Sequence, residues 1–230
     1  MEDFLQILMG VKEKILQAIK EGNSTELEML LNKDTFLGLF NAPRINSLCY
    51  DYGKSLLHVV CERGTIEQFW IVMSKNPDIN LHDKYGKSTP LHYASEKGNL
   101  EMVKILIQKG ADINALDGIS ESPLFEAACE GHSNVVRYLL DKGADIGIKD
   151  NYESTVLHQV CAVGNAGIVK LLLEYNANVN AKDNENETPL HYAYYQGKMD
   201  VVKILLENGA DSSARNKEGL LPEEIGLKGD

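Results

Sequence analysis

Two pairs of side chains in this sequence have the residue types and the spacing of metal ligands. His58 precedes Cys61 by three residues, and His158 precedes Cys161 by the same interval, so each pair would share one face of a helix. A closed zinc site needs four ligands. The two pairs could therefore form a site only if the fold brought them together.

Other motifs match known catalytic or cofactor sites only in part. Gly53-Lys54-Ser55 and Gly86-Lys87-Ser88 have the ending of a phosphate-binding loop, but leucines, Leu48 and Leu81, stand where its first glycine must be. Serine, histidine and aspartate recur along the chain at regular intervals, whereas a catalytic triad needs them at one point. We predict no catalytic site and no cofactor.

Composition narrows the class of protein. The 230 residues are 43% hydrophobic and 25% charged, which is typical of a folded globular chain. A net charge of −11 and a pI of about 5.0 argue against nucleic acid as a partner, because that affinity comes largely from cations meeting phosphate. The longest strongly apolar run, Phe69 to Met73, is too short to span a membrane, and no signal peptide is visible. We expect a cytoplasmic protein, with the nucleus as an alternative, that has free cysteines and no membrane insertion.

An internal repeat of about 33 residues organises the chain. The hexapeptide TPLHYA starts at Thr89 and again at Thr188, an interval of 99 residues. Glycines follow the same period, with successive intervals of 34, 33, 33 and 33 residues: Gly64, Gly98, Gly131, Gly164 and Gly197. Such a period predicts stacked units that each bury an apolar face against the next.

Each repeat contains start and stop signals for two helices. Thr89-Pro90, Ser122-Pro123 and Thr188-Pro189 place an N-cap hydroxyl before a proline at the first helical position. A glycine in the left-handed conformation would end this first helix. The second helix has apolar residues at helical spacing, such as Val103 and Leu106, and ends at a glycine or an asparagine: Gly110, Gly143, Asn176 and Gly209.

The repeated pattern D-x-x-G-x-T-P-L-H-x-A…G…V-x-x-L-L-x-x-G-A-D-I-N resembles the ankyrin repeat. This resemblance implies an all-α solenoid of stacked helix-turn-helix units with short β-hairpin loops, in a single domain over residues 1–230. The expected boundaries are a degenerate N-terminal cap at 11–49, full repeats at 50–82, 83–116, 117–149, 150–182 and 183–215, and a partial repeat at 216–230. The two His-Cys pairs would then lie three units apart, about 30 Å at 8–10 Å per layer of packed helices. We predict no metal site.

The ends and one loop depart from the pattern. Residues 12–21 and 25–31 predict the helices of the cap, followed by an apolar insertion at 34–50 that either extends the cap or binds a partner. The hairpin that begins at Asp83 has one residue more than its equivalents. The last unit has residues for one helix, at 222–227, so that either a short cap suffices or the chain is part of a longer protein.

In ankyrin-like stacks, partner contacts usually come from the hairpin tips and from the exposed concave side of the first helices. Tyrosines at such positions favour binding because they supply large contact area at low entropy cost. A basic row formed by Lys149, Lys182 and Arg215 could steer an acidic partner segment. The candidate contact residues by register are Tyr52, Lys54, Glu62, Arg63, Tyr85, Glu96, Lys97, Leu116, Ile119, Glu121, Glu130, Lys149, Asn151, Tyr152, Ser154, Lys182, Glu185, Glu187, Tyr195, Gln196 and Arg215.

The resemblance also implies candidate modification sites. Asparaginyl hydroxylases modify a hairpin asparagine in some ankyrin proteins, and Asn80, Asn114 and Asn180 occupy that position. The alternative is that these residues only form turns.

The expected function is a non-catalytic scaffold or adaptor that binds a protein or peptide and is monomeric by itself. Two alternatives stay open. The chain could be the regulatory segment of a larger enzyme, channel or signalling protein, or a small chaperone similar to the ankyrin-type proteasome assembly chaperone.

Overall fold

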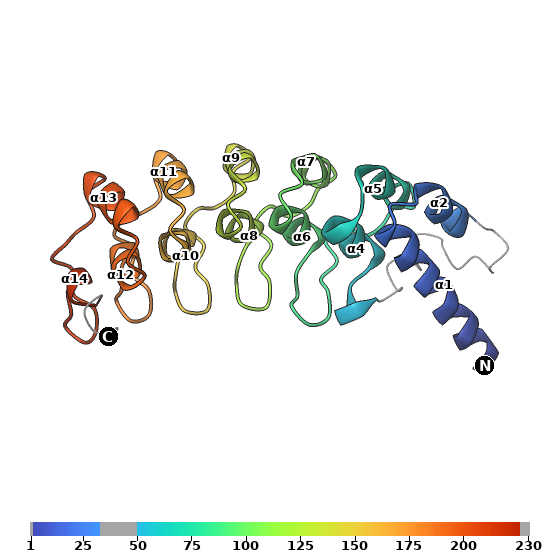
Figure 1. Ribbon diagram of the computed structural model, residues 1–230, viewed down its shortest axis with the longest axis horizontal. Helices are drawn as coiled ribbons and strands as arrows, with labels where there is room; N and C mark the ends of the chain where they lie inside the picture. Colours follow the sequence, from blue (N-terminus) through green and yellow to red (C-terminus); the bar gives the residue numbers. More distant parts are fainter. Residues whose placement is uncertain (1, 33–49, 226–230) are drawn as a thin grey trace. The chain divides into compact units, whose positions relative to one another are not determined.

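The computed structural model describes residues 2–32 and 50–225, which form helices joined by turns (Figure 1). They belong to two compact units, residues 1–112 and 113–230. Within the described residues, β-type pairing is confined to an isolated bridge between Lys149 and Thr155. The predicted insertion at 34–50 lies outside the described residues except for Tyr50.

The first unit contains two rows of helices. Its elements are α1 (Glu2–Lys20), α2 (Ser24–Asn32), the short 3-10 helix η1 (Asp51–Gly53), α4 (Leu56–Arg63), α5 (Ile66–Met73), α6 (Pro90–Glu96) and α7 (Leu100–Gln108). Helices α1, α4 and α6 pack in sequence in one row, and α2, α5 and α7 pack in the other (Figure 1). Helix α1 begins well before the predicted start at residue 12.

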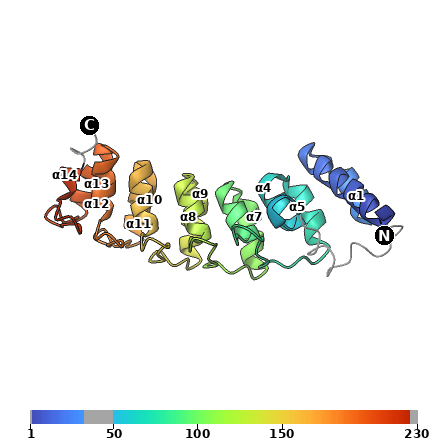
Figure 2. The same cartoon turned by 90° about the horizontal axis from the view of Figure 1, so that it is seen from below.

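The second unit repeats this arrangement. Its helices are α8 (Pro123–Cys129), α9 (Ser133–Asp141), α10 (Val156–Val163), α11 (Ala166–Glu174), α12 (Pro189–Tyr195), α13 (Met199–Glu207) and α14 (Pro222–Ile225). Helices α8, α10, α12 and α14 pack in order, as do α9, α11 and α13, and Figure 2 shows successive pairs side by side. Helix α14 thus packs on α12, and the predicted bounds of the partial repeat stay a prediction.

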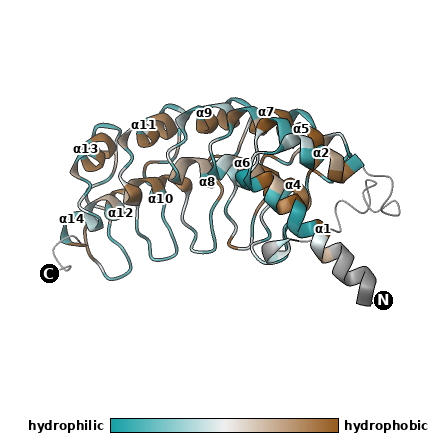
Figure 3. Ribbon diagram, turned by 45° about the vertical axis from the view of Figure 1, so that its right-hand side comes forward, coloured by the Kyte–Doolittle hydropathy of each residue, from teal (hydrophilic) through white to brown (hydrophobic). Residues whose placement is uncertain are grey.

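Apolar residues at helical spacing form the core of each unit. In α7 the predicted stripe residues Val103 and Leu106 are fully buried, and in α13 Val202 and Leu205 are buried in the same way. Figure 3 shows the apolar character of these second helices. Each such side chain contributes about 1.5–3 kcal/mol when it is removed from water. No pair of helices could bury these faces alone, so stacking stabilises the fold.

A histidine at the third helical position organises the start of four first helices. In α6, the backbone N–H of Thr89 donates to Nδ1 of His92 over 3.0 Å, and the Thr89 hydroxyl lies 2.8 Å from the same nitrogen. The equivalent backbone bonds are Ser55 to His58, Thr155 to His158 and Thr188 to His191, each 3.0 Å long. The ring therefore replaces the glutamate or glutamine of an ordinary capping box.

The second ring nitrogen joins one repeat to the next. Nε2 donates to the carbonyl of Ser88 from His58 (3.0 Å), to Glu187 from His158 (3.2 Å) and to Leu220 from His191 (3.4 Å). Since Nδ1 accepts a backbone N–H, the ring must be the neutral tautomer with its proton on Nε2. Burial lowers the pKa of His58 to about 4 and also lowers the pKa values of His158 and His191.

Gln68, on the second helix α5, makes a comparable pair of hydrogen bonds with an amide in place of an imidazole, but its link runs to the preceding repeat. Its Oε1 accepts the N–H of Thr65 at the start of α5, and its Nε2 donates to the carbonyl of Ala18 in α1, both over 3.0 Å. Gln68 is fully buried. We call the pair of hydrogen bonds made by each of these three first-helix histidines, one to its own N-cap and one to the next hairpin, the histidine clamp. Gln68 shows that an amide can make a similar pair of bonds.

The glycines that end the first helices have the predicted left-handed conformation, except for Gly64. The other four first-helix glycines have φ between +63° and +90°, and so confirm the predicted left-handed ends: Gly98, Gly131, Gly164 and Gly197. Gly64 has φ −86° and ψ 165°, so the left-handed prediction is wrong there. Glycine is still required, because a Cβ would lie 2.8 Å from the carbonyl oxygen of Val60.

The extra residue predicted in the hairpin at Asp83 is confirmed. The closing bond of that turn runs from Asp83 N–H to Ser88 O, five residues apart, whereas Asp150 closes on Ser154 and Asp183 on Glu187, four residues apart. The aspartate side chain shapes each turn as well, since one carboxylate oxygen of Asp183 accepts the N–H groups of Glu185 and Glu187.

The histidine clamp predicts a specific pH dependence of stability. Unfolded His58 binds a proton below pH 6.5, whereas the folded side chain does so only near pH 4, so the folded state loses stability as the pH falls through this window. His58→Gln should keep both hydrogen bonds, as Gln68 does, and its stability loss between pH 7 and pH 5 should be smaller than that of the wild type by about 2 kcal/mol. Urea unfolding at the two pH values measures this difference.

His58→Ala is the matched control, because it leaves the Ser55 N–H and the Ser88 carbonyl without a partner. It should lower the free energy of unfolding at pH 7 by about 2–3 kcal/mol. A His58→Gln protein that loses as much stability as the wild type between pH 7 and pH 5 would show that the imidazole is not the titrating group.

Candidate partner-binding surfaces

The first unit presents two predicted tyrosines together at its hairpin tips. Tyr52 and Tyr85 are 70% and 76% exposed, and their rings meet edge to face with centroids 6.2 Å apart. This geometry is the favoured one for aromatic pairs. The two side chains therefore form an exposed apolar patch with a defined shape.

Lys54, which the sequence placed among the exposed contacts, is buried, so that prediction is wrong. The residue is 7% exposed, its ammonium lies 2.9 Å from the carboxylate of Glu62, and the same ammonium lies 4.3 Å from the centre of the Tyr93 ring. Burial raises the pKa of Glu62, but hydrogen bonds from Lys54 and Arg63 outweigh it and lower the pKa overall. Lys54 and Glu62 thus stabilise the first repeat against the second.

The other predicted contacts of the first unit lie at the ends of first helices. Arg63 ends α4 and is exposed, with its guanidinium 2.9 Å from Glu62. Glu96 and Lys97, at the end of α6, form an ion pair with each other. Exposed pairs of this kind contribute little to stability, so these side chains can rearrange around a partner.

The hairpins of the second unit are joined to one another through the backbone. The N–H of Asn151 donates to the carbonyl of Ile119 (3.0 Å), that of Asn184 to Tyr152 (2.9 Å) and that of Lys217 to Glu185 (2.9 Å). Such bonds hold the tips at fixed spacing. Ile119 is exposed, as predicted. Only the repeat itself indicates these backbone links in the sequence.

Two predicted tyrosines of the second unit are exposed on this framework. Tyr152 at a hairpin tip is 64% exposed, and Tyr195 at the end of α12 is 66% exposed. The predicted contacts Leu116, Glu130 and Gln196 are exposed as well, whereas Ser154 is fully buried, and its predicted surface role is therefore wrong. Its hydroxyl lies 3.0 Å from that of Tyr192.

The predicted basic row is exposed but partly neutralised. Lys149 donates to Glu153 over 3.0 Å and to the carbonyl of Lys182 over 3.1 Å, and Arg215 donates to the carbonyl of Gly219. Lys182 itself is exposed. A partner carboxylate would therefore meet cations that already have local acceptors, which weakens the expected attraction.

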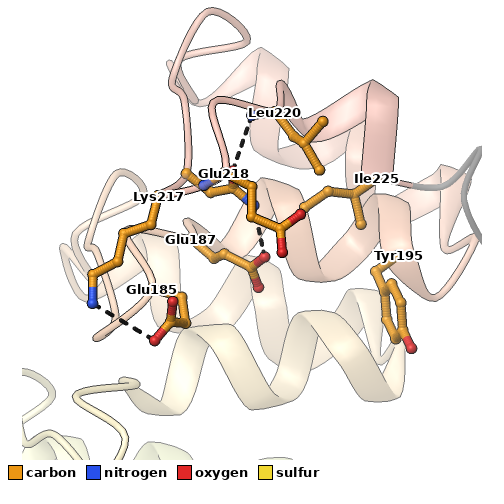
Figure 4. A pocket seen from close by; sticks show the side chains of 8 residues that line it. Glu185, Glu187, Tyr195, Lys217, Glu218, Leu220 and Ile225 are labelled. Carbon is orange, nitrogen blue, oxygen red and sulfur yellow. Dashed lines mark hydrogen bonds and ion pairs between the residues drawn. The ribbon is translucent and has the colours of Figure 1, made fainter.

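A pocket of about 270 Å³ lies beside Tyr195 in the second unit (Figure 4). It is lined by Glu185 and Glu187, which the sequence predicted, and by residues of the last hairpin and α14, which it did not: Asn216, Lys217, Glu218, Leu220 and Ile225. Lys217 pairs with Glu185 at 3.6 Å, and Asn216 donates to Glu187 over 3.1 Å. With three carboxylates and one ammonium, the pocket would attract a cationic side chain.

Three carboxylates of the second unit, from Asp117, Glu121 and Glu126, have oxygens within 4.8 Å of one another. The Asp117 carboxylate has a structural role in the hairpin turn, because one of its oxygens accepts the N–H groups of Ile119 and Glu121, each over 2.9 Å. Burial, followed by the charges of Asp117 and Asp150, raises the pKa of Glu121 to about 7. Protonation of Glu121 near neutral pH thus relieves the repulsion between its carboxylate and those of Asp117 and Asp150.

The two His-Cys pairs have no capacity left for a metal. Both ring nitrogens of His58 and of His158 are engaged in the hydrogen bonds described above. Cys61 and Cys161 are buried free thiols, and burial raises their pKa values. These thiols are therefore packing residues rather than thiolate ligands. Cys49 lies outside the described residues.

The candidate modification sites connect successive turns. Asn80 donates to the carbonyl of Gly110 (3.0 Å) and accepts the N–H of Asp112 (2.9 Å), and Asn180 makes the matching bonds to Gly209 (3.0 Å) and Asp211 (2.8 Å). Asn114 accepts the N–H of Asp145 over 2.9 Å. These contacts give each asparagine a structural role, and hydroxylation stays a prediction.

A comparison with protein-family models matches ankyrin repeats, in a three-copy form, to residues 15–117, 57–150 and 124–216. The chain belongs to the ankyrin repeat family, as the sequence pattern and the stacked helix pairs indicated. A comparison with curated proteins gives no match. In residues 2–32 and 50–225, no helix combines the length and apolar character that a membrane crossing requires.

The half-buried Glu121 predicts a second pH effect of opposite sign to that of His58. Its folded pKa lies near 7 against 4.5 for the free side chain, so its contribution to stability is complete below pH 4.5 and is lost as the pH rises towards 7. Glu121→Gln should therefore be more stable than the wild type at pH 8, by about 1 kcal/mol after allowance for solvent screening. Thermal unfolding at pH 4 and pH 8 measures the difference.

Glu130→Gln is a control from the exposed end of α8 and should change stability equally at both pH values. An unchanged stability of Glu121→Gln at pH 8 would mean that the Glu121 carboxylate is well hydrated in the folded protein.

Proposed function

We propose that this protein is a non-catalytic scaffold or adaptor that binds a protein or peptide through its hairpin tips and the ends of its first helices. Ankyrin repeats in general mediate protein–protein interactions. The observation that carries the proposal is the exposure of the four predicted tyrosines. Each is at least 64% exposed, at a hairpin tip or at the end of a first helix: Tyr52, Tyr85, Tyr152 and Tyr195. A tyrosine so exposed adds nothing to the core.

The surroundings of these tyrosines favour binding with little rearrangement. In the second unit, Tyr152 belongs to a hairpin whose carbonyl accepts the N–H of Asn184 in the next hairpin. Backbone links of this kind fix the spacing of the tips before a partner arrives, which lowers the entropy lost on binding. Charged side chains such as Glu185 and Lys217 then supply a polar rim.

A non-catalytic role is supported by the way in which the titratable groups are used. The histidines of the first helices hold caps and hairpins, and the buried thiols are protonated. Groups with shifted pKa values are thus distributed along the repeats rather than gathered around one cleft. We further propose that the protein acts in the cytoplasm, as a monomer until it meets its partner.

Affinity capture from the source organism tests the proposal. We expect Tyr152→Ala combined with Tyr195→Ala to weaken binding of the captured partner at least about tenfold, as removal of interface anchors does. The control pair, Met199→Ala with Leu206→Ala, removes two exposed apolar side chains of α13 in the same unit. Captured proteins and affinities that are unchanged by the tyrosine pair, or equally reduced by the control pair, would reject this surface.

A further inference from the structure

Trp70 is an exception among equivalent positions of the second helices. It lies five residues after the N-cap Thr65 of α5, and it is 49% exposed. The five equivalent residues are all charged and exposed: Glu28, Lys104, Arg137, Lys170 and Lys203. Stacking of repeats therefore does not require an apolar side chain at this place, and the only tryptophan of the chain needs another explanation.

The indole forms one wall of a pocket in the first unit. The pocket has a volume of about 410 Å³ and lies between α5, the turn that follows it and the end of α7. Met73, Pro77 and Ile79 supply further apolar walls, and Lys109 is the only charged residue among those that line it. This volume is in the range that encloses a large side chain or a small ligand.

Two features hold this pocket in shape without a partner. The Trp70 and Phe69 rings meet edge to face with centroids 6.2 Å apart, and Phe69 is fully buried, so the indole contacts the core. The turn is fixed by Asn76, whose φ of +51° occupies the position of the glycine that ends other second helices. The following Pro77 is buried and has its φ restricted by its ring.

The positive charge of Lys109 favours a negatively charged group in any segment that binds the pocket. Lys109 is exposed, and within the described residues it forms no ion pair. A bulky apolar side chain would bury the indole face, and a carboxylate next to it would reach the ammonium. Tryptophan is among the residues that most often dominate binding energy at interfaces.

We infer that the Trp70 pocket is a second docking site, for a partner segment with a large aliphatic or aromatic side chain beside a carboxylate. The site belongs to the second helices, on the opposite side of the helix pair from the hairpin tips (Figure 1). It is thus independent of the tyrosine surface. A partner could occupy it while the hairpins bind another segment.

Three labelled helical peptides of equal length test this inference. The first has leucines on one face with glutamates beside them, the second has lysines in place of the glutamates, and the third has serines in place of the leucines. In the wild-type protein, we expect Trp70 fluorescence to be quenched readily by acrylamide and to become protected when the first peptide binds. The serine peptide should bind at least about tenfold more weakly.

Trp70→Lys is the principal variant, because it installs the residue found at the same position in three other repeats and should fold normally. By peptide anisotropy it should bind the first peptide about tenfold more weakly than the wild type. Lys109→Glu should weaken the glutamate peptide and strengthen the lysine peptide. The Tyr152→Ala, Tyr195→Ala protein should bind the first peptide as the wild type does, which separates this site from the hairpin surface.

Several results would overturn the inference. They are equal binding of the first peptide by Trp70→Lys and wild type, absence of binding to the wild type at millimolar peptide, and no change of charge preference in Lys109→Glu. A Trp70 that is already shielded from acrylamide in the free protein would show that the chain itself or a second copy covers the pocket. Loss of folding in Trp70→Lys would show that the tryptophan is structural.

Discussion

Each of the clamped repeats is held to the next by a buried imidazole that must remain neutral. In His58, one nitrogen accepts the N–H at the start of its own helix and the other donates to the hairpin of the following repeat. Helix start, hairpin position and repeat spacing therefore depend on one side chain. Protonation would replace the accepting lone pair of Nδ1 with a donor that faces a backbone N–H, and burial opposes that change. At the start of α5, the amide of Gln68 likewise accepts one N–H and donates another, so an uncharged side chain other than imidazole can fill both roles in this protein.

Hydrogen bonds from the histidine rings fix the positions of the hairpins. The exposed side chains of the hairpins can therefore differ from repeat to repeat. The residue just before the N-cap differs as well: it is Lys54 in one repeat, Ser154 in another and Glu187 in a third. These side chains are buried or half-buried, and each has a different partner. The hairpin tips expose tyrosine in both units. A regular scaffold with irregular tips is the arrangement expected of a protein whose specificity lies in surface positions.

Most of the fold follows from sequence, since caps, stops and apolar stripes are local and recur. Thr89-Pro90 and Gly98 are recognisable without any structure because each acts on its own helix. The burial of Lys54 cannot be predicted locally, because it depends on Glu62 and on Tyr93 of the next repeat. Glycine is needed at position 64 because of a close approach to the backbone of Val60 rather than a left-handed φ, and the glycine period does not distinguish the two reasons. Trp70 becomes conspicuous only when the second helices are aligned, and its pocket depends on a turn and on Lys109 from the neighbouring helix.

The protonation state of the imidazoles tests the account most directly. Long-range ¹H–¹⁵N correlation spectra of the histidine side chains distinguish the two neutral tautomers and the charged ring. We expect His58, His158 and His191 to show an unprotonated Nδ1 and a protonated Nε2 at pH 7, and His58 to keep this pattern at pH 5, where an ordinary histidine is charged. Rings that carry the proton on Nδ1, or a His58 that titrates near pH 6.5, would contradict the clamp on which the described stacking depends.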